Sequence, residues 1–188
     1  MYSVIIRIRN EEQHIGQSIQ SCIDFLGNPE IVIVNDNSTD KSMYICRLFI
    51  SNNNLESELN ANYCNLKILD IDEYTPGRAL NLGVKNCSFN NVIILSSHCS
   101  IIKFNKSTIQ KNLNKYGVLF GNQTPYYYGK RIQKRYIWSN FSNEEVINMW
   151  SESEGRYFFH NAASIFKKEI LINNPFDEEL VGKEDRYW

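Results

Sequence analysis

Short apolar runs alternate, over the first hundred residues, with segments whose apolar positions recur at helical spacing. The runs lie at residues 4–8, 31–34, 66–69 and 92–95, and the helical spacing lies at 15–26, 43–50 and 79–87. Runs without polar alternation are typical of strands that are buried on both faces of a parallel sheet. Strands that alternate with helices indicate βαβ units with right-handed crossovers. The pattern therefore predicts an α/β fold with a mainly parallel central sheet.

Polar residues mark where the first two helices should begin. Asn10 is a good cap for the first helix, and Glu11 and Glu12 would then lie in its first turn, where carboxylates complement the helix dipole. Ser38 or Asn37 would cap the second helix in the same way.

The pattern changes after residue 100. We expect a short helix around 109–113, strands at 118–120 and 162–166, and a short helix at 168–171. Aromatic residues without a clear period lie between them: Tyr126, Tyr127, Tyr128, Tyr136, Trp138, Trp150 and Tyr157. They could stack on sugar rings, but aromatic side chains are mostly core, and we predict a core role. Neither a repeat nor a linker is evident, so residues 1–188 are predicted to form a single domain.

Composition narrows the class of protein. The net charge of −1 gives no electrostatic footprint for nucleic acid, and no apolar run approaches the roughly 20 residues that span a bilayer. The five cysteines are odd in number and contain no CxxC pair, which indicates reduced thiols in a cytoplasmic protein.

Polar clusters follow several predicted strands: Arg9-Asn10, Asn35-Asp36 and Ser96-Ser97-His98. In open α/β sheets ligands bind beyond the carboxyl ends of strands, so these clusters could form one pocket. Asp36 could accept a hydrogen bond from a ribose hydroxyl or a base, and Arg78 could bind a phosphate. Alternatively, Asp36 belongs to a capping turn and Arg78 is an exposed helix residue. A GxGxxG motif after the first strand and a GxxxxGK[ST] motif are both absent from the sequence, which argues against a dinucleotide-binding dehydrogenase and a P-loop nucleotidase.

Five blocks in order resemble family 2 glycosyltransferases of the GT-A fold: VIIRIRNEE, EIVIVNDNSTD, YTPGRALNLGV, VIILSSHCS and PFDEELVGKEDRYW. The resemblance is closest to a bacterial subgroup that works on surface polysaccharide such as lipopolysaccharide. It implies a Rossmann-like three-layer sandwich with a nucleotide-binding half at 1–100 and an acceptor and catalytic half at 101–188. It also implies transfer from a nucleotide-sugar donor to a glycan or lipid-linked acceptor, with inversion, in the cytoplasm or at the inner membrane face. Family members normally continue further, so we expect the chain to be truncated at its C-terminus.

The resemblance also implies roles for individual residues. Asp36 matches the acidic residue that contacts the nucleoside, and Glu184-Asp185 matches the ED motif whose aspartate is the usual catalytic base. Ser96 and His98 stand where the family has the two acids of its DxD metal motif. The expected nucleotide-binding residues are Arg7, Arg9, Asn10, Asp36, Ser38, Arg78, Ser96 and Ser97.

The chemistry of glycosyl transfer agrees with these roles. Inversion needs a base that takes the acceptor proton, for which we choose Asp185, with Glu184 orienting it. Alternatively, these two residues begin an exposed helix and form a local ion pair.

The leaving diphosphate needs positive charge, usually from a divalent ion such as Mg²⁺ or Mn²⁺. His98 is the candidate metal ligand, and because an imidazole suits softer ions, it favours Mn²⁺. Arg78, Lys130 or Arg131 could replace the ion. His160 and Asn161 are candidates for contact with the acceptor, although a structural role is more usual for such a histidine.

Two other functions remain open. A nucleotidyltransferase of similar fold should carry a glycine-rich, basic loop after the first strand, and RNEEQHIG is a poor version of one. A non-catalytic module that binds nucleotide-sugars would explain the lost DxD acids.

Overall fold

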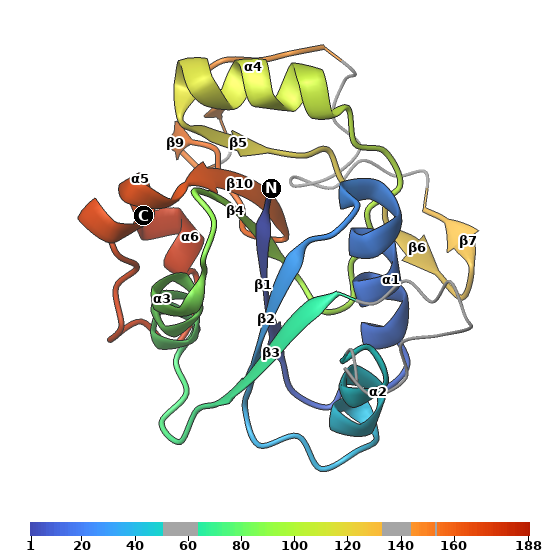
Figure 1. Cartoon of the computed structure of the whole chain (residues 1–188). Coiled ribbons are helices and arrows are strands. Elements are labelled where there is room, and N and C mark those ends of the chain that lie inside the picture. The colour runs from blue at the N-terminus through green and yellow to red at the C-terminus, as the bar shows by residue number, and fades with distance from the viewer. Residues whose placement is uncertain (51–63, 133–143, 153) are drawn as a thin grey trace.

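The structure is a computed structural model that describes residues 1–50, 64–132, 144–152 and 154–188. Within these ranges a six-stranded sheet has the order β3-β2-β1-β4-β10-β5 (Figure 1). Its strands are β1 (Ser3–Ile8), β2 (Glu30–Asn35), β3 (Asn65–Asp70), β4 (Asn91–Leu95), β5 (Val118–Phe120) and β10 (Ala163–Lys167). The strands β1, β2, β3 and β4 are parallel to one another, and β10 is antiparallel to both β4 and β5. The predicted mainly parallel sheet is therefore confirmed, and the sheet takes strands from both halves of the chain.

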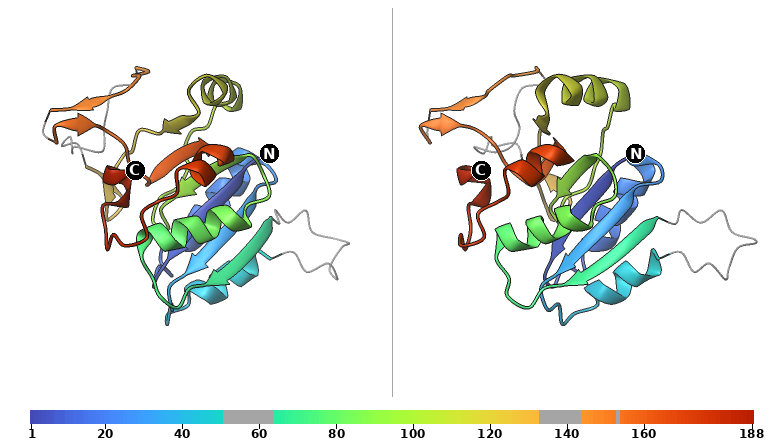
Figure 2. Two further views of the ribbon diagram at one scale, coloured as in Figure 1. Left: turned by 90° about the vertical axis from the view of Figure 1, so that its left-hand side faces the viewer. Right: turned by 60° about the vertical axis from the view of Figure 1, so that its left-hand side comes forward.

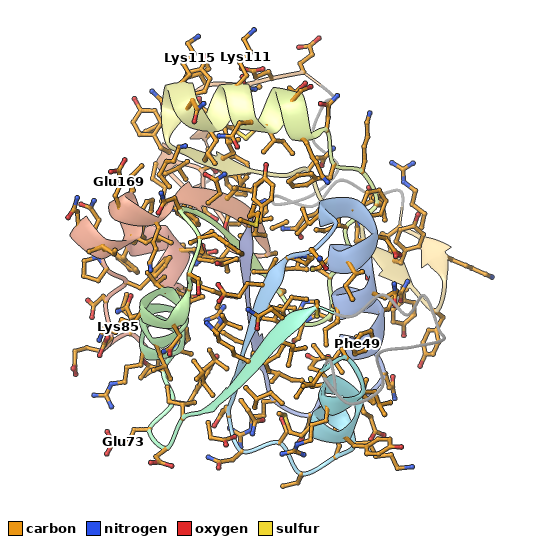
Figure 3. The ribbon with its side chains drawn as sticks, viewed as in Figure 1. Phe49, Glu73, Lys85, Lys111, Lys115 and Glu169 are labelled. Carbon is orange, nitrogen blue, oxygen red and sulfur yellow. The ribbon has the colours of Figure 1, made fainter. Side chains whose placement is uncertain are left out.

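Helices cover both faces of this sheet, which gives the three predicted layers (Figures 1 and 2). The helices are α1 (Ile15–Leu26), α2 (Ser42–Leu48), α3 (Pro76–Asn86), α4 (Lys106–Tyr116), α5 (Lys168–Asn173) and α6 (Glu184–Tyr187). The helices α1 and α2 pack on one face, and α3 and α5 pack on the other. The helix α4 lies at the edge of the sheet formed by β5. Its side chains Lys111 and Lys115 point away from the sheet into solvent (Figure 3).

The central strands are buried on both faces, as their unbroken apolar runs predicted. Ile6 of β1 and Ile33 of β2 contribute to the core under α1 and α2, whereas Ile5 and Val32 contribute to the core under α3. All four side chains are fully buried, and each such burial stabilises the fold by roughly 1.5–3 kcal/mol. Gly83 lets α3 approach closely, because a Cβ there would lie 2.6 Å from Ile5 Cγ2.

The predicted starts of α1 and α2 are wrong. Residue 15 begins α1 and residue 42 begins α2, and neither helix has a side-chain cap. The Asn10 side chain instead accepts hydrogen bonds from the backbone of Thr39 and Asp40, at 2.7 and 3.3 Å. The Ser38 hydroxyl accepts from the Asn10 amide at 3.1 Å. These side chains join the β1–α1 loop to the β2–α2 loop, so they are not available to cap their own helices.

The prediction of a core role for the aromatic stretch is correct for Phe158, which is buried, and wrong for the two ribbons that precede it. This stretch forms two short antiparallel ribbons, β6 (Tyr126–Tyr127) with β7 (Lys130–Arg131), and β8 (Trp150–Ser151) with β9 (Arg156–Tyr157). Their aromatic side chains are largely exposed: Tyr126, Tyr127, Tyr128, Trp150 and Tyr157. The other two aromatic residues of that prediction, Tyr136 and Trp138, lie outside the described residues.

The amino ends of the strands are closed by a buried carboxylate, Glu30. It accepts hydrogen bonds from Lys67 Nζ at 2.6 Å, from Ser3 Oγ at 2.5 Å, and from both the amide and the hydroxyl of Ser88, at 2.6 and 2.7 Å. Burial alone would raise the pKa of Glu30, but these donors outweigh it and lower the pKa to about 2. Glu30 therefore ties β1, β2, β3 and the α3–β4 loop together.

All five cysteines are free thiols, as expected, and four of them are buried. Burial raises the pKa of Cys22, Cys46 and Cys87 to about 12, so these thiols are unreactive. In the part of the chain that the structure describes, none of the helices has the length and apolar character needed to cross a bilayer.

Candidate active site

A pocket of about 280 Å³ lies at the carboxyl ends of β1, β2 and β4. Its lining residues are Arg7, Ile8, Arg9, Glu11, Asp36, Tyr74, Ser96, Ser97 and His98. The chain runs outward from β1 through β2 to β3 and then crosses back to β4, so the order of the strands reverses between β1 and β4. Ligands of open α/β sheets bind at such a switch point. Part of each predicted polar cluster lines the pocket, whereas Asn10, Asn35 and Ser38 do not.

Asp36 forms part of this pocket and is paired with Arg9. The Asp36 carboxylate is buried, and Arg9 Nη1 donates to it at 3.0 Å from a side chain that is 70% exposed. The Asp36 amide donates to the Ile8 carbonyl at 2.9 Å, which fixes the residue against the end of β1. A ligand hydroxyl could replace the exposed guanidinium on Asp36 at little cost, because solvated ion pairs contribute little.

Asn35, the residue before Asp36, has a structural role. The side-chain Nδ2 of Asn35 donates to Asp70 Oδ1 at 2.7 Å, and its side-chain Oδ1 accepts from the backbone amide of Ser38 at 3.1 Å. Asn35 therefore holds the ends of β2 and β3 and the following turn in place beneath Asp36.

The loop that carries the polar cluster after β4 is held by α1. The Ser18 hydroxyl donates to the Ser97 carbonyl at 2.6 Å, and the Ser21 hydroxyl accepts from the Ile101 amide at 3.0 Å. Both serines are buried within the helix. They fix the backbone from which Ser96, Ser97 and His98 reach the pocket.

His98 and Glu11 face each other across the pocket rim, with His98 Nδ1 3.6 Å from Glu11 Oε1. Among residues 1–50, 64–132, 144–152 and 154–188, no group of three or more histidine, cysteine, aspartate or glutamate side chains could hold a metal. The pair supplies one imidazole nitrogen and one carboxylate, so a bound ion would need further ligands from the substrate.

The short helix α6 carries the two predicted catalytic carboxylates, and the first of them, Glu184, contacts a residue of the pocket. Arg7, which lines the pocket, pairs with Glu184, with Arg7 Nη1 2.9 Å from Glu184 Oε1. Asp185 Oδ2 accepts a long hydrogen bond of 3.3 Å from the Asn161 amide. Burial and then the neighbouring Glu184 charge raise the pKa of Asp185 above its ordinary value. A carboxylate of raised pKa is a stronger base, which suits the expected role of Asp185.

The segment that leads to α6 is clamped to α3. The Asn81 side chain donates to the Phe176 carbonyl at 2.9 Å and accepts from the Phe176 amide at 3.0 Å, and it also donates to Glu178 at 2.8 Å. Gly77 leaves room for this contact, because a Cβ there would lie 2.1 Å from the Asp177 carbonyl oxygen. The GRALN block therefore holds in position the segment that leads to Glu184 and Asp185.

Arg78, which the sequence placed in the nucleotide pocket, does not line it. Its guanidinium lies 2.6 Å from Glu73, on the loop before α3 (Figure 3), and 3.8 Å from Glu178. Thr75 caps α3 through the Arg78 amide and donates to the Glu178 carbonyl at 2.8 Å. Arg78 therefore belongs to the clamp, and its charge is already compensated by two carboxylates.

His160 and Asn161 precede β10 and are both buried. The His160 ring packs against both Phe120 and Phe158, with Gln123 and the Gly121 carbonyl as polar neighbours. Burial lowers the pKa of His160 to about 4. This environment is that of a structural histidine.

Asn161 differs from His160, because neither atom of its side-chain amide has a hydrogen-bond partner among the described residues. Its backbone amide is the donor to Asp185, so the unpartnered amide lies next to the proposed base.

The sequence reading missed Glu11 and Tyr74. Both line the pocket and lie within four residues of a strand's carboxyl end, Glu11 after β1 and Tyr74 after β3. Their position just after polar strand ends was the available signal. Tyr74 is 39% exposed and offers an aromatic face at the rim.

The sequence is similar to a known protein family over most of its length. The model of Glycosyl transferase family 2 matches residues 3–173. The chain is 35% identical over 196 residues to the minor teichoic acid biosynthesis protein GgaA of Bacillus subtilis, covering 98% of the chain and 41% of GgaA.

Two solved structures show the fold. S. aureus TarS 1–349 in complex with UDP has a TM-score of 0.69 at 22% identity, covering 98% of this chain and 52% of that one. The mannosyltransferase PcManGT from Pyrobaculum calidifontis, in complex with GDP-Man and Mn²⁺, has a TM-score of 0.60 at 15% identity, covering 98% and 49%. The chain thus spans about half the length of these proteins.

Proposed function

The chain belongs to glycosyl transferase family 2, and from this premise we propose that it transfers a sugar from a nucleotide-sugar donor to a glycan or lipid-linked acceptor, with inversion, in cell-surface polysaccharide biosynthesis. One observation carries the proposal: the ion pair between Arg7, which lines the pocket, and Glu184, the neighbour of Asp185. It joins a ligand pocket at the switch point to a basic carboxylate, and transfer needs both within reach of one another.

The donor nucleotide is proposed to bind between Asp36 and Tyr74. The buried Asp36 carboxylate would accept hydrogen bonds from ribose hydroxyls, and Tyr74 would stack on the base. Arg9, which is largely exposed, would then turn to the diphosphate, together with the hydroxyls of Ser96 and Ser97.

A divalent ion is proposed to bind with the donor, held by His98 and Glu11 and completed by the diphosphate. An imidazole nitrogen beside a carboxylate suits Mn²⁺ better than Mg²⁺. The ion would supply positive charge to the leaving diphosphate. With two protein ligands, little binding is expected before the nucleotide is present.

Asp185 is proposed to take the proton from the attacking acceptor hydroxyl. Its raised pKa gives it basicity, and the clamp on α3 together with the Arg7–Glu184 pair fixes its position. The unpartnered Asn161 amide beside it would bind an acceptor hydroxyl, because a buried polar group without a partner is costly until a ligand satisfies it. We further propose a cytoplasmic location, with peripheral association with the inner membrane face, because such an acceptor would be presented there.

A non-catalytic nucleotide-sugar-binding module is the second candidate. It is favoured by one observation, the serine and histidine that stand in place of the two DxD acids. Such a module would bind the donor normally and show no turnover with any acceptor, whereas the enzyme would show both.

Replacement of Asp36 tests the donor site. We expect Asp36→Ala to weaken binding of the preferred nucleotide by about 1–3 kcal/mol, the range for a lost hydrogen bond to a charged group, measured by calorimetry. The preferred nucleotide is first found by thermal-shift screening of UDP-, dTDP-, GDP- and CMP-sugars with and without Mn²⁺.

The control variant is Asp24→Ala, which removes an exposed carboxylate from α1, away from the pocket. Equal affinity of the Asp36→Ala variant and the wild type would show that Asp36 only orders its turn.

A further inference from the structure

The β8–β9 ribbon presents two aromatic side chains to solvent as a pair. Trp150 lies directly opposite Tyr157 in the antiparallel register, and their rings meet edge to face with centroids 5.3 Å apart. Trp150 is 50% exposed and Tyr157 is 63% exposed. The two exposed rings together form an apolar surface patch, and such a patch can serve as a ligand-binding site.

The ribbon is fixed to α6 through one carboxylate. Glu154, in the turn of the ribbon, pairs with Arg156 of β9, with Arg156 Nε donating at 2.6 Å. The same carboxylate pairs with Arg186 of α6 at 3.2 Å. Glu154 is nearly buried, with a side-chain exposure of 10%, so these pairs hold the ribbon more firmly than solvated ones would. The aromatic pair therefore has a defined position relative to the residue before Arg186, which is Asp185.

Consecutive residues of α6 contact different parts of the site. Glu184 pairs with Arg7 on the donor side, and Arg186 pairs with Glu154 on the side of the ribbon. Asp185 stands between them in the chain, and the ribbon lies beside α6 in both views of Figure 2. Since the acceptor oxygen attacks from the side away from the leaving group, a base between donor pocket and ribbon receives its acceptor from the ribbon side.

We propose that Trp150 and Tyr157 form a platform that binds a pyranose ring of the acceptor. Aromatic faces pack against the C–H face of a sugar, and the polar edge of each ring can still bond to its hydroxyls. Neither ring of the platform carries a charge, so the two rings themselves would recognise the C–H face of a sugar and need no charged group on it. The assignment of this sugar as the acceptor rests on the proposed function.

The probes are the methyl β-glycosides of glucose, galactose and N-acetylglucosamine, and binding is measured by saturation-transfer NMR on the full chain. We expect ring C–H signals for at least one glycoside, and roughly tenfold weaker binding in Trp150→Ala and in Tyr157→Ala, about the loss of one aromatic contact. Trp150→Phe should restore most of the affinity, because it keeps an aromatic face.

The matched control is Tyr127→Ala, since Tyr127 is 67% exposed, lies on the other ribbon and also packs edge to face, against Tyr128. Each variant is checked for an unchanged melting temperature. Equal losses in Tyr127→Ala and Trp150→Ala, or no glycoside binding by the wild type, would overturn the platform.

Two further outcomes would also overturn it. If the wild type sediments as a dimer and Trp150→Ala sediments as a monomer, the two rings bind a second copy of the chain. Binding to phosphatidylglycerol vesicles that Trp150→Ala abolishes, without glycoside binding, would assign them to a membrane. Nucleotide affinity is measured on the same samples. A wild type that binds no nucleotide would refute the proposed function, whereas a wild type that binds nucleotide but no glycoside would refute the platform alone.

Discussion

The two ends of the parallel strands each carry a buried or partly buried carboxylate, and they treat its charge in opposite ways. At the amino ends Glu30 accepts four short hydrogen bonds, one of them from an ammonium group, and its pKa falls to about 2. At the carboxyl ends Asp185 accepts one long hydrogen bond from Asn161, has a second carboxylate beside it, and its pKa is raised. The first arrangement stabilises the charge and the fold, whereas the second makes the carboxylate a stronger base.

The largest effect is expected from replacement of Asp185. Asp185→Asn keeps the shape but removes the basicity, so turnover should fall by roughly 10²–10⁴-fold, the usual contribution of a positioned base. Because the folded pKa lies above the unfolded one, ionisation of Asp185 opposes folding at neutral pH, and the variant should melt no earlier than the wild type. Steady-state rates and melting curves at pH 7 check both points. Near-normal turnover would exclude Asp185 as the base.

Replacement of the Glu30 carboxylate by an amide, at the amino ends of the strands, should lower the stability of the protein and leave turnover unchanged. Glu30→Gln should cost about 2 kcal/mol at pH 7, a value reduced from the full pKa difference because Lys67 is partly solvated. A lowered folded pKa stabilises the protein above the unfolded value of 4.5, and this contribution is lost as the pH falls towards 2. Urea unfolding of the wild type between pH 6 and 2.5 should show that loss, and the variant should lack it.

The matched control for Glu30 is Glu169→Gln, an exposed glutamate on α5 (Figure 3), which should change stability by less than about 0.5 kcal/mol. If Glu30→Gln is no less stable than this control, the network at the amino ends contributes nothing net.

The smallest effect is expected from replacement of Glu184, which removes one of the two neighbouring carboxylates at the carboxyl ends of the strands. Glu184→Gln takes away the neighbouring carboxylate that helps to raise the pKa of Asp185, so the acid limb of kcat/KM should move to lower pH. Burial, the larger cause, remains, so the limb should stay above the position of an ordinary aspartate. Glu179→Gln, an exposed acid of the same segment, is the control. An unmoved limb would mean that the two carboxylates do not interact.

Much of the fold could be predicted because the decisive signals are local. The run Val92-Ile93-Ile94-Leu95 has no polar position, and such a segment is stable only between two apolar layers. The helix starts could not be predicted, because Asn10 and Ser38 have the chemistry of caps but bond across to a second loop. Nothing in either segment records that partner.

The site could be predicted in part for the same reason. Asp36 and Ser97 follow strands directly, so the parallel sheet alone brings them together. Arg78 was placed wrongly because a guanidinium is suited equally to a phosphate and to the carboxylates of Glu73 and Glu178. The exposed Trp150 was expected in the core because hydropathy ranks a side chain and does not reveal whether a neighbouring layer exists to cover it.

The contact between Asn81 and Phe176 also bears on how the chain folds. These residues are 95 positions apart, and closing a loop of that length costs about 4 kcal/mol of chain entropy. The parallel strands β1, β2 and β3 and the helices between them close much shorter loops, so we expect them to assemble earlier. The segment that carries Asp185 would then join a nearly finished domain, and the chain would acquire its binding pocket before it acquires its base.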